Sequence, residues 1–173
     1  MPNINTIINS HNNKIINPST LPNNQPTCNC MRKEQCPMNG NCLASKIVYE
    51  ATLTSDLPNY DVKKYIGLCD TTFKKRYATH KISFAHVKYK GSTTLSMEFW
   101  RIKENNGNPS ISWKILKNST SFSPDTGSCQ LCQEEKYKIA TYPNNNLLNK
   151  RTEIVSKCRH MNKFYLATYD SRD

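Results

Sequence analysis

The stretch "KKYIGLCDTTFKKRYATHK", residues 63 to 81, joins a predicted strand to a predicted helix and decides the fold. Residues 62 to 69 read as a strand, and the polar "DTT" that follows offers a cap for a helix over residues 71 to 87. At about 100° per residue, Arg76 and His80 share one stripe of this helix with its aromatic residues. An arginine on such a stripe either meets a carboxylate or an outside anion, or lies at the stripe's edge and reaches water.

The neighbouring segments predict a small α/β (α+β) domain. Alternating apolar residues predict a strand over residues 45 to 54, with Ile47, Tyr49, Ala51 and Leu53 on one face. A third strand is expected at 111 to 117, and further helices at 94 to 105, 129 to 142 and 150 to 157. This order predicts a mostly antiparallel three-stranded sheet flanked by helices.

Composition and charge indicate the class of partner. The 173 residues suit one domain, and the net charge of +11 produces a surface that attracts polyanions, with nucleic acid as the default. A basic surface without a ligand is the alternative. Residues 1 to 27 are rich in asparagine and are expected to form a disordered arm. The sequence shows neither a signal peptide nor an apolar run of about 20 residues. We therefore expect an intracellular protein, nuclear or cytoplasmic, that is not embedded in a membrane.

Eight cysteines in a reducing compartment favour metal binding over disulfides. Residues 28 to 44 form a compact polar segment expected to be a zinc knuckle, because four thiolates around a zinc ion supply folding energy that so short a segment lacks. Its predicted ligands are Cys28, Cys30, Cys36 and Cys42. The alternative is a set of free surface thiols.

A second zinc site is predicted from "CQLC" and the later "CRH". Cys129 and Cys132 stand at the start of a helix, and residues 151 to 173 contribute Cys158 and His160. The alternative is that these short motifs are unrelated.

One acidic side chain is also expected to face inward. On the helix from residue 129, Glu135 shares a face with Ile139, whereas Glu134 points away. Glu135 and Arg76 can form a structural ion pair, or they can be the metal-binding acid and the phosphate clamp of a nuclease. Helical periodicity leaves both interpretations open.

Several motifs resemble the GIY-YIG endonuclease family in order and spacing. They are "IVY" at 47 to 49, "YIG" at 65 to 67, Arg76, His80, Glu135 and "LLN" ending at Asn149. The resemblance covers about residues 45 to 150. The cysteine knuckle, "CQLC" and "LLNKRTEIVSKCRH" look more narrowly like the endonuclease domain of Penelope-like retroelements. Ile47 replaces the glycine of the family's first motif.

The resemblance implies a GIY-YIG-like core that hydrolyses phosphodiester bonds in DNA, nicking one strand to prime reverse transcription. It implies that Arg76 stabilises charge on the phosphate and that Glu135 holds one Mg²⁺ or Mn²⁺ ion. Tyr49 is then the candidate general base, while Tyr65 and His80 position water and orient the Tyr49 phenol.

The remaining implied roles concern support and binding. Asn149 is expected to hold the local geometry by hydrogen bonds, and Lys74 and Lys75 to contact the DNA backbone. Glu98 and Glu153 are rival metal ligands outside the family order.

A reverse transcriptase domain of the same element is an implied partner. The alternative functions are a catalytically inactive zinc-dependent DNA-binding module and a zinc-stabilised interaction domain.

Overall fold

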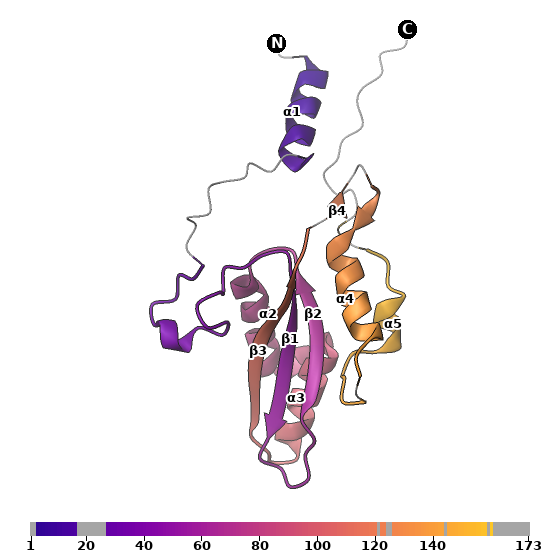
Figure 1. The fold of residues 1–173 in the computed structure, drawn as a ribbon. Coiled ribbons are helices and arrows are strands. Elements are labelled where there is room, and N and C mark those ends of the chain that lie inside the picture. Colours follow the sequence, from indigo (N-terminus) through magenta and orange to yellow (C-terminus); the bar gives the residue numbers. More distant parts are fainter. Residues whose placement is uncertain are drawn as a thin grey trace.

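The computed structural model describes residues 3–16, 27–120, 122–123, 126–143, 145–158 and 160. Its helices are α1 (Ile4–Ile16), α2 (Phe73–Ala85), α3 (Thr94–Glu104), α4 (Gln130–Ala140) and α5 (Arg151–Ile154), with short 3-10 helices η1 (Lys33–Gln35) and η2 (Val87–Ser92). Its strands are β1 (Ile47–Ser55), β2 (Lys63–Cys69), β3 (Pro109–Asn118), β4 (Phe122–Ser123) and β5 (Ser128–Cys129). Figure 1 shows these elements along the chain.

The centre of the molecule is an antiparallel sheet in the order β2-β1-β3. Tyr49 on the middle strand pairs with Gly67 on one side and with Ile115 on the other. A β-bulge interrupts the pairing with β3 between Val48 and Tyr49, and bulges commonly re-aim side chains next to functional sites. The predicted fold class, a small three-stranded antiparallel sheet with helices, is confirmed.

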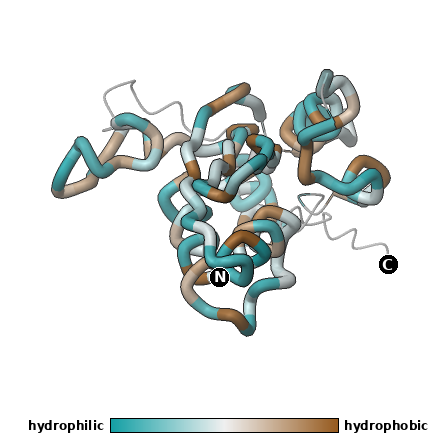
Figure 2. The backbone as a smooth tube through the Cα atoms, turned by 90° about the horizontal axis from the view of Figure 1, so that it is seen from below, coloured by the Kyte–Doolittle hydropathy of each residue, from teal (hydrophilic) through white to brown (hydrophobic). Residues whose placement is uncertain are grey.

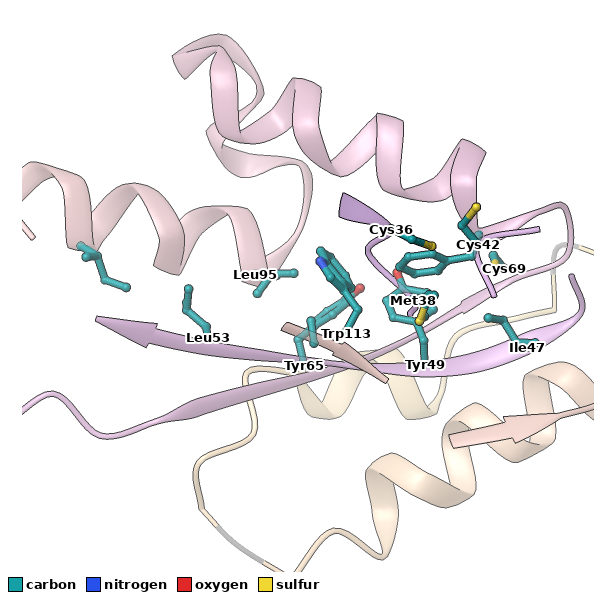
Figure 3. Packing of buried hydrophobic residues seen from close by; sticks show 13 residues of the cluster. Cys36, Met38, Cys42, Ile47, Tyr49, Leu53, Tyr65, Cys69, Leu95 and Trp113 are labelled. Carbon is teal, nitrogen blue, oxygen red and sulfur yellow. The ribbon is translucent and has the colours of Figure 1, made fainter. Parts of the chain in front are cut away.

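Helices lie on both faces of this sheet. Helices α2 and α3 pass behind the sheet in Figure 1, and α4 lies beside β2. Alternate β1 side chains point to opposite faces, so Tyr49 packs against Phe73 of α2, whereas Val48 packs with Leu131 of α4. In Figure 3 the labelled side chains of β1 all rise on one side of the sheet. We call these two sides the α2 face and the α4 face.

The free edge of β2 is covered by a segment that the sequence did not reveal as extended. The Lys64 N–H donates to Asn146 O at 2.9 Å, and the Leu148 N–H donates to Lys64 O at 2.7 Å. A parallel bridge links Lys64 with Leu147. This pairing brings Asn149 beside the strand that carries the YIG motif.

Two local elements differ from the sequence expectation. Helix α1 lies within the segment predicted to be a disordered arm, and the spacing of Ile4, Ile7 and Ile8 suits one face of a helix. The remaining arm residues, 1–2 and 17–26, lie outside the described ones. Strands β4 and β5 form a hairpin before α4.

Hydrophobic and hydrophilic residues alternate along the tube in Figure 2. This is expected where each helix or strand packs one face on the core and exposes the other to solvent. Among the described helices, none combines the length and the apolar character that a membrane span requires.

Candidate active site

The hydroxyl of Tyr49 lies between two side chains of α2. Arg76 Nε donates to Tyr49 Oη at 3.1 Å, and Tyr49 Oη lies 2.8 Å from His80 Nε2. Arg76 and His80 stand four residues apart, one helical turn, so both reach the same point on β1. The structure thus brings together three residues of the predicted site.

Aromatic rings enclose this cluster on the α2 face. The Tyr49 ring meets the Phe73 ring edge-on at a centroid distance of 5.2 Å, and the His80 ring lies 5.1 Å from the Trp113 ring. Tyr65 is buried on the same face, 6.4 Å from the His80 ring. Figure 3 shows Tyr49, Tyr65 and Trp113 gathered over the sheet. Tight ring packing leaves the Tyr49 hydroxyl little freedom to move.

Burial sets the protonation states of this cluster. It raises the pKa of Tyr49 to about 12, although the Arg76 charge opposes the shift. Burial and the charge of Arg76 lower the pKa of His80 to about 3, so the imidazole is neutral at physiological pH. Burial also raises the pKa of Tyr65. A neutral imidazole has one nitrogen free to accept a proton, which the Tyr49 phenol can donate.

Gly67 has a role in packing that the sequence pattern did not reveal. It lies within β2, opposite Tyr49. A Cβ atom at this position would lie 2.5 Å from Tyr49 Oη and 3.0 Å from Tyr65 Cε1. Glycine is therefore required here so that the Tyr49 hydroxyl can lie against the β2 backbone. The available signal was a glycine inside a strand pattern, two residues after Tyr65, since such a glycine often marks a close approach of another group.

Glu135 approaches the cluster from the α4 side of β2. Burial and the charge of Glu153 raise its pKa to about 7, while Arg76 and the Leu68 backbone N–H oppose the shift. The charges of Arg76 and Glu153 therefore both act on the Glu135 carboxyl, in opposite directions. The Glu135 carboxyl and the Arg76 guanidinium thus belong to helices on opposite faces of the sheet and interact electrostatically.

Asn149 acts as an additional pairing partner for β2. The Ile66 N–H donates to Asn149 Oδ1 at 2.7 Å, and Asn149 Nδ2 donates to Ile66 O at 2.8 Å. The same amide donates to Glu153 Oε2 at 2.6 Å, which places that carboxylate at this edge as well. Sequence order had ranked Glu153 below Glu135, and the tertiary structure brings the two together.

The other candidate residues lie outside the Tyr49 cluster. Glu98 of α3 accepts from the Tyr60 hydroxyl at 3.1 Å and pairs with Arg101 at 2.6 Å, so its carboxylate is already engaged. Lys74 and Lys75 are exposed in the first turn of α2. Ile47, which stands where the GIY-YIG motif has a glycine, is fully buried in the core of the α2 face.

The first cysteine cluster can hold a metal ion such as zinc. The ligand atoms of Cys28, Cys30, Cys36 and Cys42 all lie within 4.8 Å of one another. Four sulfurs at the corners of a zinc tetrahedron lie roughly 3.8 Å apart, as Zn–S bonds of about 2.3 Å require. The Cys30–Cys42 and Cys28–Cys42 sulfur pairs, at 3.6 and 3.5 Å, are close to that spacing.

Hydrogen bonds around Cys36 favour a thiolate. Burial raises its pKa, but the backbone N–H groups of Met38 and Gly40 and neighbouring thiols outweigh this and lower it to about 6. Burial raises the pKa of Cys42 to about 12, so a metal ion would have to displace that proton.

The second cluster joins α4 to the segment after α5. The ligand atoms of Cys129, Cys132, Cys158 and His160 also lie within 4.8 Å of one another. Cys132 Sγ lies 3.4 Å from Cys158 Sγ and 3.2 Å from His160 Nδ1. Three thiols and one imidazole in this arrangement can likewise hold a metal ion such as zinc.

Comparisons of the chain with protein-family models, with curated proteins and with solved structures find no match.

Proposed function

We propose that this chain is a metal-dependent DNA endonuclease of the GIY-YIG type that hydrolyses phosphodiester bonds and nicks one strand. The observation that carries the proposal is the hydroxyl of Tyr49, held between Arg76 and His80, with the charge of Arg76 also acting on the Glu135 carboxyl of α4. A structural ion pair alone would not require a phenol in hydrogen-bond contact with both a guanidinium and a neutral imidazole.

The protonation states define how these residues would activate water. Tyr49 is protonated at neutral pH, so it can take a proton from water only by giving its own to His80 Nε2. The pKa of His80 is lowered, so this transfer needs the negative charge of a bound phosphate to offset the charge of Arg76 and raise that pKa. The hydroxide oxygen then bonds to phosphorus, and the bond from phosphorus to the 3′ oxygen breaks, leaving the electron pair on that oxygen. Arg76 stabilises the negative charge on the phosphoryl oxygens and on the phenol. Tyr65 packs beside His80 and restricts the position of its ring.

A divalent cation fits the acidic side of the site. Burial and the nearby charge of Glu153 both raise the pKa of Glu135, and a bound cation would favour its ionised form. Carboxylate oxygens are the ligands that Mg²⁺ and Mn²⁺ prefer. When bound, the ion polarises the scissile phosphate and stabilises the leaving 3′ oxygen. Asn149 keeps Glu153 and the β2 edge in place.

DNA is the proposed substrate, and the net charge of +11 supports it. Lys74 and Lys75 lie two residues and one residue before Arg76, where they can contact phosphates beside the site. The two cysteine clusters are proposed to hold structural Zn²⁺. In a retroelement, the nick would supply a 3′ end to a reverse transcriptase domain of the same element.

One observation favours a second candidate, a DNA-binding module without catalysis. The side chain of Tyr49 is fully buried, so water reaches its hydroxyl only if DNA binding opens the site. A module that keeps the fold but never opens would bind DNA and leave it intact.

A plasmid assay distinguishes the two candidates. Supercoiled plasmid is incubated with the full chain and Mg²⁺, and the conversion to open circles is measured for wild type, Tyr49→Phe and Glu135→Ala. We expect nicking by wild type and losses of about 100-fold or more in both variants, the usual contribution of acid–base and metal groups.

Two variants serve as controls for that assay. Tyr60→Phe removes a hydroxyl bonded to Glu98, and Glu134→Ala removes the neighbouring acid, so both are expected to nick at the wild-type rate. DNA binding by every variant is followed by fluorescence anisotropy. Binding without nicking by wild type would support the non-catalytic module, and absence of both would support an interaction domain.

A further inference from the structure

The first turn of α2 is capped by the first cysteine cluster. Thr72, at the N-cap position, makes no side-chain capping bond. Instead the Phe73 N–H donates to Ala44 O at 2.8 Å, and the Lys74 N–H donates to Cys42 O at 2.7 Å. The first N–H groups of a helix lack intrahelical partners, so these bonds satisfy donors that would otherwise be left open. Cys42 therefore serves both as a potential metal ligand and as a helix cap.

Side chains reinforce that connection. Lys74 Nζ donates to Asn29 Oδ1 within the cluster segment at 2.7 Å. Cys36, Met38 and Cys42 are buried in the same hydrophobic cluster as Phe73. The segment is thus part of the core of the α2 face, although its sequence suggested a separate knuckle. Displacing it would expose the start of the helix that carries Arg76 and His80.

The second cysteine cluster makes the corresponding connection on the α4 face. Cys132 stands three residues, about one turn, before Glu135 on α4. Cys158 follows the short helix α5, and Lys136 Nζ donates to the backbone oxygen of Ser156. Helix α5 has four residues, too few to be stable without tertiary contacts. Pairing with β2 holds the start of this segment at Asn149, and the cluster fastens its other end, after Glu153, to α4.

We propose that the two cysteine clusters, each loaded with a metal ion, hold the two halves of the site independently. The first holds α2 with Arg76 and His80, and the second holds α4 against the segment from Asn149 to Cys158. The importance of these positions for catalysis rests on the proposed function, whereas the two connections themselves do not.

Hydrogen–deuterium exchange of the full chain tests this inference, with zinc content measured on the same samples. Cys36→Ser is expected to lose one zinc ion and to raise exchange in the first turn of α2 roughly fivefold or more, as loss of a helix cap implies. Exchange in α4 should stay unchanged. Cys132→Ser is expected to lose the other ion and to raise exchange in α4 and in residues 147–158, while α2 stays protected.

Cys69→Ser is the matched control, because Cys69 is a buried cysteine that belongs to neither cluster. It should retain both zinc ions and both protection patterns. Cys158→His, which replaces the thiolate ligand with an imidazole nitrogen, should retain most of the zinc that Cys132→Ser loses. If a serine variant does not fold, stepwise removal of zinc from wild type with a chelator applies the same test, with region-specific exchange expected at each step.

Two results would overturn the inference: wild-type protein that binds no zinc, or loss of one ion that raises exchange equally in both regions. Neither readout requires nuclease activity. A chain that shows both region-specific responses but never cuts DNA would overturn the proposed function and leave this inference standing.

Discussion

The two faces of the sheet bury different chemistry. The α2 face contains Tyr49, Tyr65, Phe73 and Trp113, with a cation and a neutral imidazole among the rings. The α4 face is a smaller aliphatic layer, built around Val48, Ile66, Leu131 and Ile139, with an acid at its margin.

The difference shows how one strand serves two purposes. Neighbouring residues of β1, Val48 and Tyr49, point to opposite faces, so the aromatic layer and the aliphatic layer share a backbone. The charged groups Arg76 and Glu135 come from helices on opposite faces, and their charges still act on each other.

The largest expected effect is on the free energy of unfolding, and it comes from truncating one buried side chain on each face. Phe73→Ala should lower the free energy of unfolding by about 3–5 kcal/mol, because a fully buried ring is replaced by a cavity. Leu131→Ala on the smaller face should cost about 2–3 kcal/mol, since that layer can relax. Urea denaturation measures both values. A cost for Leu131→Ala that equals or exceeds that for Phe73→Ala would contradict the comparison.

A smaller effect is expected where the α2 face meets the backbone of β2. Gly67→Ala should cost about 1–3 kcal/mol, because its Cβ would overlap the Tyr49 hydroxyl. It should also abolish nicking, since the phenol must leave Arg76 and His80. Gly91→Ala is the control, because no atom lies within 4 Å of a Cβ there. Unfolding curves and the plasmid assay that leave Gly67→Ala unchanged would refute the role assigned to this glycine.

The two faces should also respond to pH with opposite sign in the absence of added divalent cation. The folded-state pKa of His80 is lowered from 6.5 to about 3, so its contribution makes stability fall as pH drops below 6.5. The folded-state pKa of Glu135 is raised from 4.5 to about 7, so its contribution makes stability fall as pH rises from 4.5 through 7. Between pH 4.5 and pH 6.5, the contributions of His80 and Glu135 to the free energy of unfolding therefore cancel in wild type.

Single variants separate those contributions. Between pH 5 and 6.5, Glu135→Gln should become more stable with rising pH, and His80→Gln less stable, each by up to about 1.4 kcal/mol per pH unit. Urea denaturation across this range measures the slopes. Equal slopes in the two variants would show that the groups do not titrate as their surroundings imply.

The smallest effect is expected at the β2 edge. Asn149→Ala removes both bonds to Ile66 and should cost about 1 kcal/mol, because water can replace the amide at this half-exposed edge. Asn145→Ala, an exposed neighbour, should cost almost nothing. Thermal unfolding measures the difference in stability between the two variants. Equal stability would show that the Asn149 hydrogen bonds do not stabilise the β2 edge.

The strands of the sheet and its flanking helices could be predicted from the sequence, because their hydrophobic periodicity is a local property. The alternation from Ile47 to Leu53 predicts the buried face of β1, and all four of its alternate residues are buried. Helix α1 and the hairpin of β4 and β5 escaped prediction. The segment of α1 is rich in asparagine, and this composition favoured a prediction of disorder over the helical spacing of its isoleucines. Strands β4 and β5 have two residues each, too few to show an alternating pattern.

The amino-acid sequence by itself determined which side chains share a strand face or a helix stripe, since those periods depend on covalent geometry. Only the tertiary structure decided that Gly67 makes room for a phenol, that Glu153 joins Glu135, and that Cys42 caps α2. Each of these relations joins residues far apart along the chain or on different strands. Their distances follow from packing and strand register, which no local pattern encodes.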